Sequence, residues 1–131
     1  LPSAAKSPSL FLLLALNTQT ISVRPEVTGY LGHDVTLPCN FNKASVNDTV
    51  TQVQWDLLEP VKYKIIVSNP QFGVNISDSP LKEKVNVTEQ SLIIKGVELE
   101  DAGLYSCVLS TFPSGPLKGT TKLIVRGECG K

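Results

Sequence analysis

Two cysteines with a tryptophan between them constrain this chain more than any other feature. Cys39 and Cys107 lie far apart in the sequence, Trp55 lies between them, and the run DAGLYSC occupies positions 101–107. A disulfide that packs against an indole ring, with a tyrosine two positions before the second cysteine, is typical of two β-sheets packed face to face. We therefore expect Cys39 and Cys107 to be bonded in the core of a sandwich.

The same residues predict the fold class, which is all-β with the immunoglobulin topology. Tyr105 has the position of the tyrosine corner, where the phenol bonds to the backbone a few residues upstream. Asp101 stands at that corner, and we expect it to pair with a basic residue, Lys82 or Lys84. Trp55, Tyr105 and Asp101 are thus predicted core residues.

Alternation of apolar and polar residues predicts the strands. In 104–110, Tyr105, Cys107 and Leu109 point inward and the residues between them outward, while 111–118 reads as a loop. A short strand after Gly73 adds a second hairpin to the strand at 63–67, and this addition predicts a variable-type domain. The expected strands are 21–24, 27–31, 35–39, the segment around Trp55, 63–67, the strand after Gly73, 85–88, 92–94, 104–110 and 119–125.

The chain divides into three segments. Residues 1–20 contain the apolar run 10–16, which is too short to span a bilayer and predicts a signal peptide that is incomplete because it lacks Met. Residues 21–126 form the variable-type domain. Residues 127–131 are a tail or truncation remnant, in which Cys129 has no predicted partner within the chain.

Several features indicate an extracellular protein, on the cell surface if a longer form has a membrane anchor and secreted otherwise. A disulfide persists only in an oxidising compartment. Asn47, Asn75 and Asn86 each begin an Asn-X-Ser/Thr sequon and are predicted glycosylation sites. Glycans are bulky and lie on the surface, so we expect them away from any interface.

Composition argues against catalysis and against several kinds of ligand. The 131 residues have a net charge of zero, which gives no reason to expect nucleic acid. The single histidine, His33, lies in a predicted turn, and the cysteines lack metal-ligand spacing. We therefore expect no enzyme activity, no cofactor, no metal and no small-molecule substrate.

Three short motifs resemble elements of the nectin and poliovirus-receptor family. Residues 111–115, Thr-Phe-Pro-Ser-Gly, resemble that family's signature before its last strand, and 50–52, Val-Thr-Gln, resemble its element at the start of the tryptophan strand. Residues 66–73 resemble its third element, although Ile66 stands where the family has a small residue. Within them, 69–73 is most similar to a lymphocyte receptor of the family.

The resemblance implies recognition of a related receptor on another cell. The resemblance implies that first domains of the family pair face to face through the sheet that contains the C, C′, C″, F and G strands. Here these are the strand around Trp55, 63–67, the strand after Gly73, 104–110 and 119–125. An aromatic side chain from each domain enters a pocket on the other. Phe112 would be that aromatic residue, in a loop shaped by Pro113 and Gly115. The predicted partner-binding residues are Thr51, Gln52, Gln71, Phe72, Gly73, Thr111, Phe112, Pro113 and Gly115.

Two other functions remain open. The same face could pair with itself, giving a homophilic adhesion module and a possible homodimer. An antigen-receptor variable domain is the other alternative. Residues 119–125 resemble the last strand of such a domain, but the aromatic-Gly-x-Gly bulge that should precede that strand is absent from 115–119.

Overall fold

A computed structural model describes residues 20–42, 49–113 and 115–127 of the chain. Apart from Thr20, the expected signal peptide lies outside these residues, as do Asn47 and Cys129. The elements in chain order are β1 (Thr20–Val23), β2 (Glu26–Tyr30), β3 (Val35–Leu37), β4 (Cys39–Asn42), β5 (Thr49–Glu59), β6 (Tyr63–Asn69), β7 (Gly73–Ile76), β8 (Val85–Thr88), β9 (Ser91–Ile94), a 3-10 turn η1 (Leu99–Asp101), β10 (Gly103–Phe112) and β11 (Gly115–Arg126).

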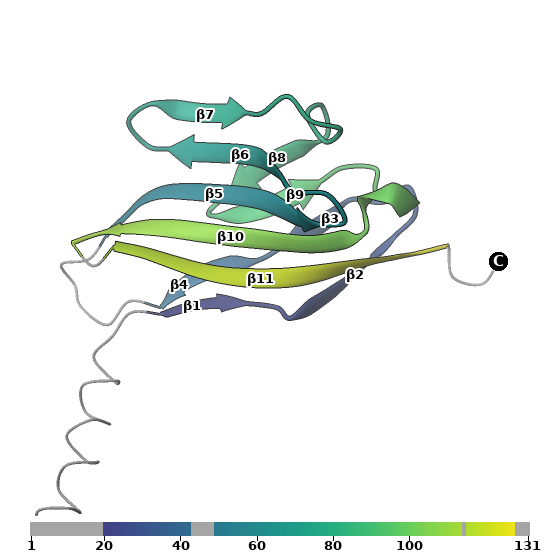
Figure 1. The fold of residues 1–131 in the computed structure, drawn as a ribbon, viewed down its shortest axis with the longest axis horizontal. Helices are drawn as coiled ribbons and strands as arrows, with labels where there is room; N and C mark the ends of the chain where they lie inside the picture. The colour runs from purple at the N-terminus through teal and green to yellow at the C-terminus, as the bar shows by residue number, and fades with distance from the viewer. Residues whose placement is uncertain (1–19, 43–48, 114, 128–131) are drawn as a thin grey trace, which may run out of the picture.

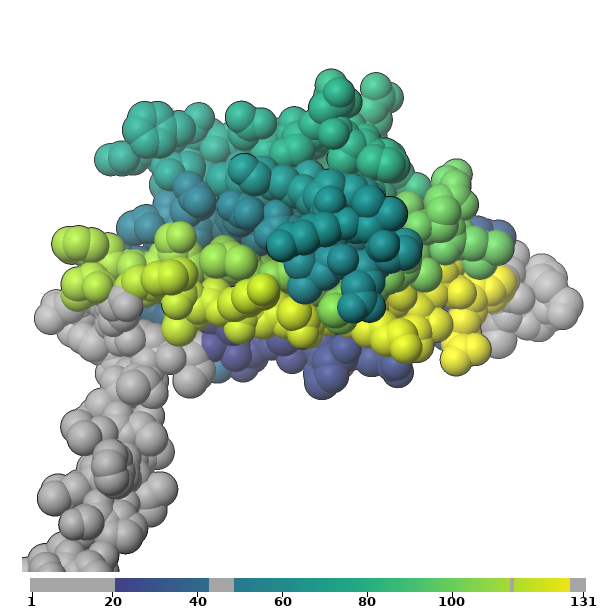
Figure 2. Space-filling model, in the orientation of Figure 1, coloured from purple at the N-terminus to yellow at the C-terminus, as the bar shows by residue number. Residues whose placement is uncertain are grey.

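The strands form two packed layers, as predicted for a variable-type sandwich (Figure 1). One layer is a six-stranded sheet in the order β2-β11-β10-β5-β6-β7. Figure 2, in the orientation of Figure 1, shows the surface of this sheet in front. The other layer contains the sheet β3-β9-β8 and the pair β1-β4. All pairings are antiparallel except that of β2 with β11. Strands β6 and β7 are the predicted extra hairpin, which extends the first sheet.

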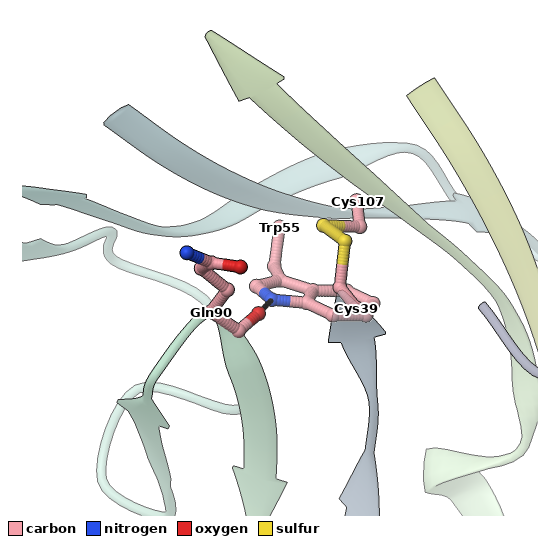
Figure 3. Close-up of a disulfide and its surroundings, with 4 residues drawn as sticks. All are labelled: Cys39, Trp55, Gln90 and Cys107. Atoms are coloured by element: carbon pink, nitrogen blue, oxygen red, sulfur yellow. Dashed lines mark hydrogen bonds between the residues drawn. A yellow bond between two sulfur atoms is a disulfide. The ribbon is translucent and has the colours of Figure 1, made fainter. Parts of the chain in front are cut away.

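Cys39 and Cys107 join the two layers at the centre of the molecule, as predicted (Figure 3). Both cysteines and Trp55 are fully buried. The indole Nε1 donates a hydrogen bond of 2.9 Å to the backbone oxygen of Gln90, which lies in the turn between β8 and β9. Gln90 has a φ of 81°, a left-handed conformation that is uncommon outside glycine. The buried tryptophan thus has its polar group satisfied by a turn of the opposite layer.

The corner before β10 has the predicted tyrosine contact. The Tyr105 hydroxyl donates to the backbone oxygen of Asp101 at 2.5 Å, and Tyr105 is fully buried. The Asp101 carboxylate accepts from Lys84 Nζ at 2.7 Å and from the backbone N–H of Glu98 at 2.8 Å. Lys84, rather than Lys82, is therefore the basic partner of Asp101. These bonds hold η1 against the start of β10.

Pro38 divides the strand predicted at 35–39 into two. β3, before it, pairs with β9, whereas β4, after it, pairs with β1. Proline has no N–H to donate to a ladder, so the strand changes partner where that donor is missing. Pro38 thus marks the switch between the two pairings.

One prediction for the β10–β11 region is wrong in part, and another is confirmed in direction. Residues 111–118 are not a loop, because the ladder continues to the pair Thr111 and Gly115 and leaves only a tight turn. Ser106 faces away from the core, as its register predicts, but it is fully buried. Its Oγ has no hydrogen-bond partner among the described residues. Alternation gives the direction of a side chain but not the cover that neighbouring strands provide.

Replacing both Cys39 and Cys107 with Val should lower the free energy of unfolding by about 2–5 kcal/mol, the usual cost of losing a native disulfide. Chemical denaturation followed by the fluorescence of Trp55 would measure this change, because that ring packs in the same core. Equal midpoints for the wild type and the double variant would contradict the central role of the bond.

Tyr105→Phe should lower the free energy of unfolding by about 1–3 kcal/mol at pH 7, because the Asp101 oxygen loses its buried donor. Burial, and next the charge of Asp101, raise the pKa of Tyr105 above its ordinary value of 10.0. The folded state therefore favours the neutral phenol, so its contribution is complete below about pH 10 and declines as the pH rises above that value. The difference between wild type and variant should shrink by about pH 11; a constant difference would contradict this linkage.

Candidate protein-binding face

The side of the six-stranded sheet that is turned away from the core is the candidate site, and we call it the outer face. On β5, Val53, Trp55 and Leu57 are buried, so Gln54 and Asp56 between them point outward. Partners across a ladder project from the same side of a sheet. The register then adds the following residues to the outer face: Val67 on β6, Ser106, Val108, Ser110 and Phe112 on β10, and Lys118 and Thr120 on β11.

The outer face is low in relief along β10, and beside that strand a hollow of about 520 Å³ is lined by Gln54, Asp56, Lys62, Tyr63 and Lys64. Ser106, Val108 and Ser110 follow one another along β10, and all three have small side chains. Beside them, the Gln54 side chain donates to both carboxylate oxygens of Asp56, at 3.0 and 3.1 Å. A strip of small side chains along β10 suits contact with another sheet. Lys64, opposite Asp56 in the ladder, and Lys118, opposite Val108, add positive charge to the face.

Phe112 stands at the end of this face, next to a hydrogen bond that links the ends of β10 and β11. Thr111 is buried, and its hydroxyl donates to the backbone oxygen of Gly115 at 2.6 Å, which closes the turn. Gly115 has a φ of 101°, a conformation that glycine adopts without steric cost. The Phe112 side chain is 70% exposed, so it does not fold back over its own sheet edge. Pro113 beside it is exposed as well.

Thr51 and Gln52 lie next to this turn, on β5. The register shifts so that Ser110 faces Gln52 and Thr111 faces Val50, which makes Thr51 the extra residue of a β-bulge. The Thr51 hydroxyl donates to the Ser110 backbone oxygen at 3.1 Å, and its side chain is exposed. A bulge redirects side chains at the end of a strand, and here it brings Thr51 to the surface.

The turn between β6 and β7 presents a second exposed aromatic residue. Asn69 Oδ1 accepts the backbone N–H groups of Gln71 at 2.8 Å and of Phe72 at 3.2 Å, an arrangement that fixes the turn. Gly73 completes it with a φ of 87°. Phe72 is 86% exposed. In Figure 1 this turn lies at the same end of the sheet as the turn between β10 and β11.

The predicted binding residues therefore gather at one end of the outer face, but they do not line one pocket. A nearby hollow of about 200 Å³ is lined by Gln52 together with Val50, Pro70, Glu89 and Gln90, among others. Thr51, Gln71, Phe72 and Gly73 are not in its wall. No sequence signal pointed to Glu89 or Gln90, because the turn between β8 and β9 reaches this place only through the packing of the two layers.

Within residues 20–42, 49–113 and 115–127, no group of three His, Cys, Asp or Glu side chains is arranged to hold a metal ion. No helix in that part of the chain has the length and apolar character needed to cross a membrane.

Comparisons with known proteins agree with the fold and with the motifs. The family model described as "Immunoglobulin V-set domain" matches residues 22–126. Mouse nectin-2 is 32% identical over 95% of this chain, and zebrafish nectin 1b is 26% identical over 86% of it. The chain spans only 27% and 23% of those two proteins. The structure of murine CRIg has a TM-score of 0.72 and 20% identity, with 83% of this chain and 98% of that one covered.

Gly115→Ala should disturb the turn that carries Phe112. No atom lies within 4 Å of the added methyl group, so the effect would come from the positive φ alone. We expect a loss of about 1 kcal/mol or more in the free energy of unfolding, because an L-residue is strained in this conformation. Thermal unfolding would measure it, with Gly127→Ala, which also has open space around it and has no positive φ, as the control. Equal stabilities would contradict this account.

Proposed function

The chain belongs to the immunoglobulin V-set family and is nectin-like, and we propose that its outer face binds a related receptor ectodomain on an opposing cell. V-set domains of this kind belong to adhesion and immune-receptor ectodomains and are not enzymes. Fold alone does not identify a ligand, so the proposal depends on the residues of the face.

The single observation that carries the proposal is the exposure of Phe112. An aromatic side chain that is 70% exposed on a closed, hydrogen-bonded turn leaves much apolar surface in water. Such a residue can enter a pocket of a partner, and the hydrogen bond from Thr111 to Gly115 lowers the entropic cost of holding it in place. The strip of small side chains along β10 would then lie against the partner's own sheet.

The partner would receive Phe112 and present an equivalent aromatic residue in return. Thr51 and Gln52, with Gln71, Phe72 and Gly73 on the neighbouring turn, would receive that residue here. The hollow beside Gln52 suggests that Glu89 and Gln90 also contribute to the receiving surface. A related ectodomain is the favoured partner because nectins are among the relatives that match most of the chain. Residues 69–73 resemble the corresponding stretch of Tactile, the lymphocyte receptor mentioned above. That the chain shares the partner preference of this receptor stays a prediction.

An antigen-receptor domain is disfavoured by the regular β10–β11 ladder. Its register runs without a shift from Gly103 to Thr111, whereas the missing aromatic-Gly-x-Gly motif would have introduced a bulge. Pairing with a second copy uses the same face and is an outcome of the experiment below. The proposed location is extracellular, with residues 1–20 as the signal peptide and the sequons glycosylated.

Phe112→Ala should weaken binding by more than about 1 kcal/mol and leave folding intact, because the side chain is mostly in solvent. The chain, secreted with a dimerising tag, would be tested by surface plasmon resonance against first domains of nectins and against itself. Leu99→Ala is the matched control. Leu99 is 60% exposed but lies in η1, at the other end of β10 from Phe112.

Binding to a nectin domain that is lost with Phe112→Ala and kept with Leu99→Ala is the expected result. Binding to itself alone would replace the proposal with homophilic adhesion. Binding that survives Phe112→Ala would remove Phe112 from the interface. A folded protein that binds no domain of the panel would overturn the proposed function.

A further inference from the structure

One of the predicted glycosylation sites lies on the outer face itself. Asn75 is exposed on β7, the edge strand of the six-stranded sheet, and begins the sequon that ends at Ser77. This position conflicts with the expectation that glycans lie away from the interface. The two assignments can both hold only if a glycan at Asn75 limits what the face can bind.

The ladder register places Asn75 in one row with the centre of the face. Asn75 pairs with Val67 on β6, Val67 with Gln54 on β5, Gln54 with Val108 on β10, and Val108 with Lys118 on β11. These side chains project from the same side of the sheet. Three strand spacings separate Asn75 from Val108, which is about 14 Å. A solvated carbohydrate chain rooted there would stand beside the flat surface that a partner sheet must approach.

The sequon at Asn86 provides an internal contrast. On β8, Val85 is buried and Val87 packs against the core, so Asn86 between them faces outward from the other layer. Asn86 is exposed too, so a glycan could be accommodated there. Its glycan would project from the opposite side of the sandwich and would leave the outer face open.

We propose that N-glycosylation of Asn75 regulates adhesion by obstructing the outer face, so that the form without this glycan binds its partner more tightly. This inference rests on the proposed function. In this modification an oligosaccharide is transferred from a lipid-linked diphosphate donor to the Asn75 amide nitrogen. The sugar C–O bond to the diphosphate breaks, a C–N bond to the amide forms, the amide loses a proton and the lipid diphosphate leaves. The effect of the glycan is steric, because the residues that would make contact, Gln54 and Val108, remain unchanged.

The test compares folded proteins that differ only at this site. The double variant Asn47→Gln/Asn86→Gln, secreted by mammalian cells, retains only the Asn75 sequon. Mass spectrometry measures its occupancy, and surface plasmon resonance against the nectin panel and the chain itself measures Kd before and after enzymatic deglycosylation. Because the glycan is removed after folding, any need for it during secretion does not affect the comparison.

Matched variants separate the glycan from the residues of its sequon. Ser77→Ala abolishes the sequon and keeps Asn75, whereas Ser77→Thr keeps the sequon. The backbone N–H of Ser77, which donates to Ile65 at 2.9 Å, is present in both. We expect Ser77→Ala and deglycosylation to lower Kd by about tenfold, and Ser77→Thr and Asn86→Gln to leave it unchanged.

Two results would overturn the inference and leave the proposed function standing. The first is secreted protein in which Asn75 carries no glycan. The second is a glycan at Asn75 whose removal leaves Kd unchanged, while Phe112→Ala still abolishes binding. Silence of both glycoforms toward the whole panel would instead overturn the proposed function and the inference with it.

Discussion

The disulfide between Cys39 and Cys107, packed against Trp55, is the interaction on which the rest of the structure depends. It joins β4 of one layer to β10 of the other, and β10 is the strand with the longest ladders on both sides. The indole of Trp55 then reaches the turn at Gln90. Through these contacts one buried cluster fixes the separation and alignment of both sheets, and with them the position of β10 in the outer face.

Much of this arrangement follows from the sequence because its signals are local or strongly constrained. Two lysines near Asp101 in the sequence were the candidate partners, and one of them, Lys84, is its partner. The alternation of apolar and polar residues predicted that Tyr105 and Leu109 point inward. What alternation did not reveal was the extent of pairing. The segment 111–118 reads as a loop because it contains Pro and Gly, yet Thr111 and Gly115 close it into a turn. A side-chain hydrogen bond between two specific residues leaves no periodic pattern in the sequence.

The two exposed aromatic residues of the candidate site were predictable from the sequence, whereas the residues that lie around them were less so. Phe112 and Phe72 are exposed aromatic residues on turns that Gly115 and Gly73 make possible, and these residues are visible in the sequence. The bulge at Thr51, the approach of Glu89 and Gln90, and the row that joins Asn75 to Val108 all depend on register. Register is a relation between distant segments, so a single sequence gives it only where both strands carry unambiguous patterns.

The long strand β11 has a mechanical consequence. It runs without interruption from Gly115, beside the Phe112 turn, to Arg126 at the opposite end of the domain. Along this path it pairs with β10 on one side and, in parallel, with β2 on the other. A pull applied at the turn and resisted near Arg126 would load this strand lengthwise. The hydrogen bonds of both ladders would then have to break together rather than one by one. We therefore expect the domain to resist force applied along β11 better than force applied across it.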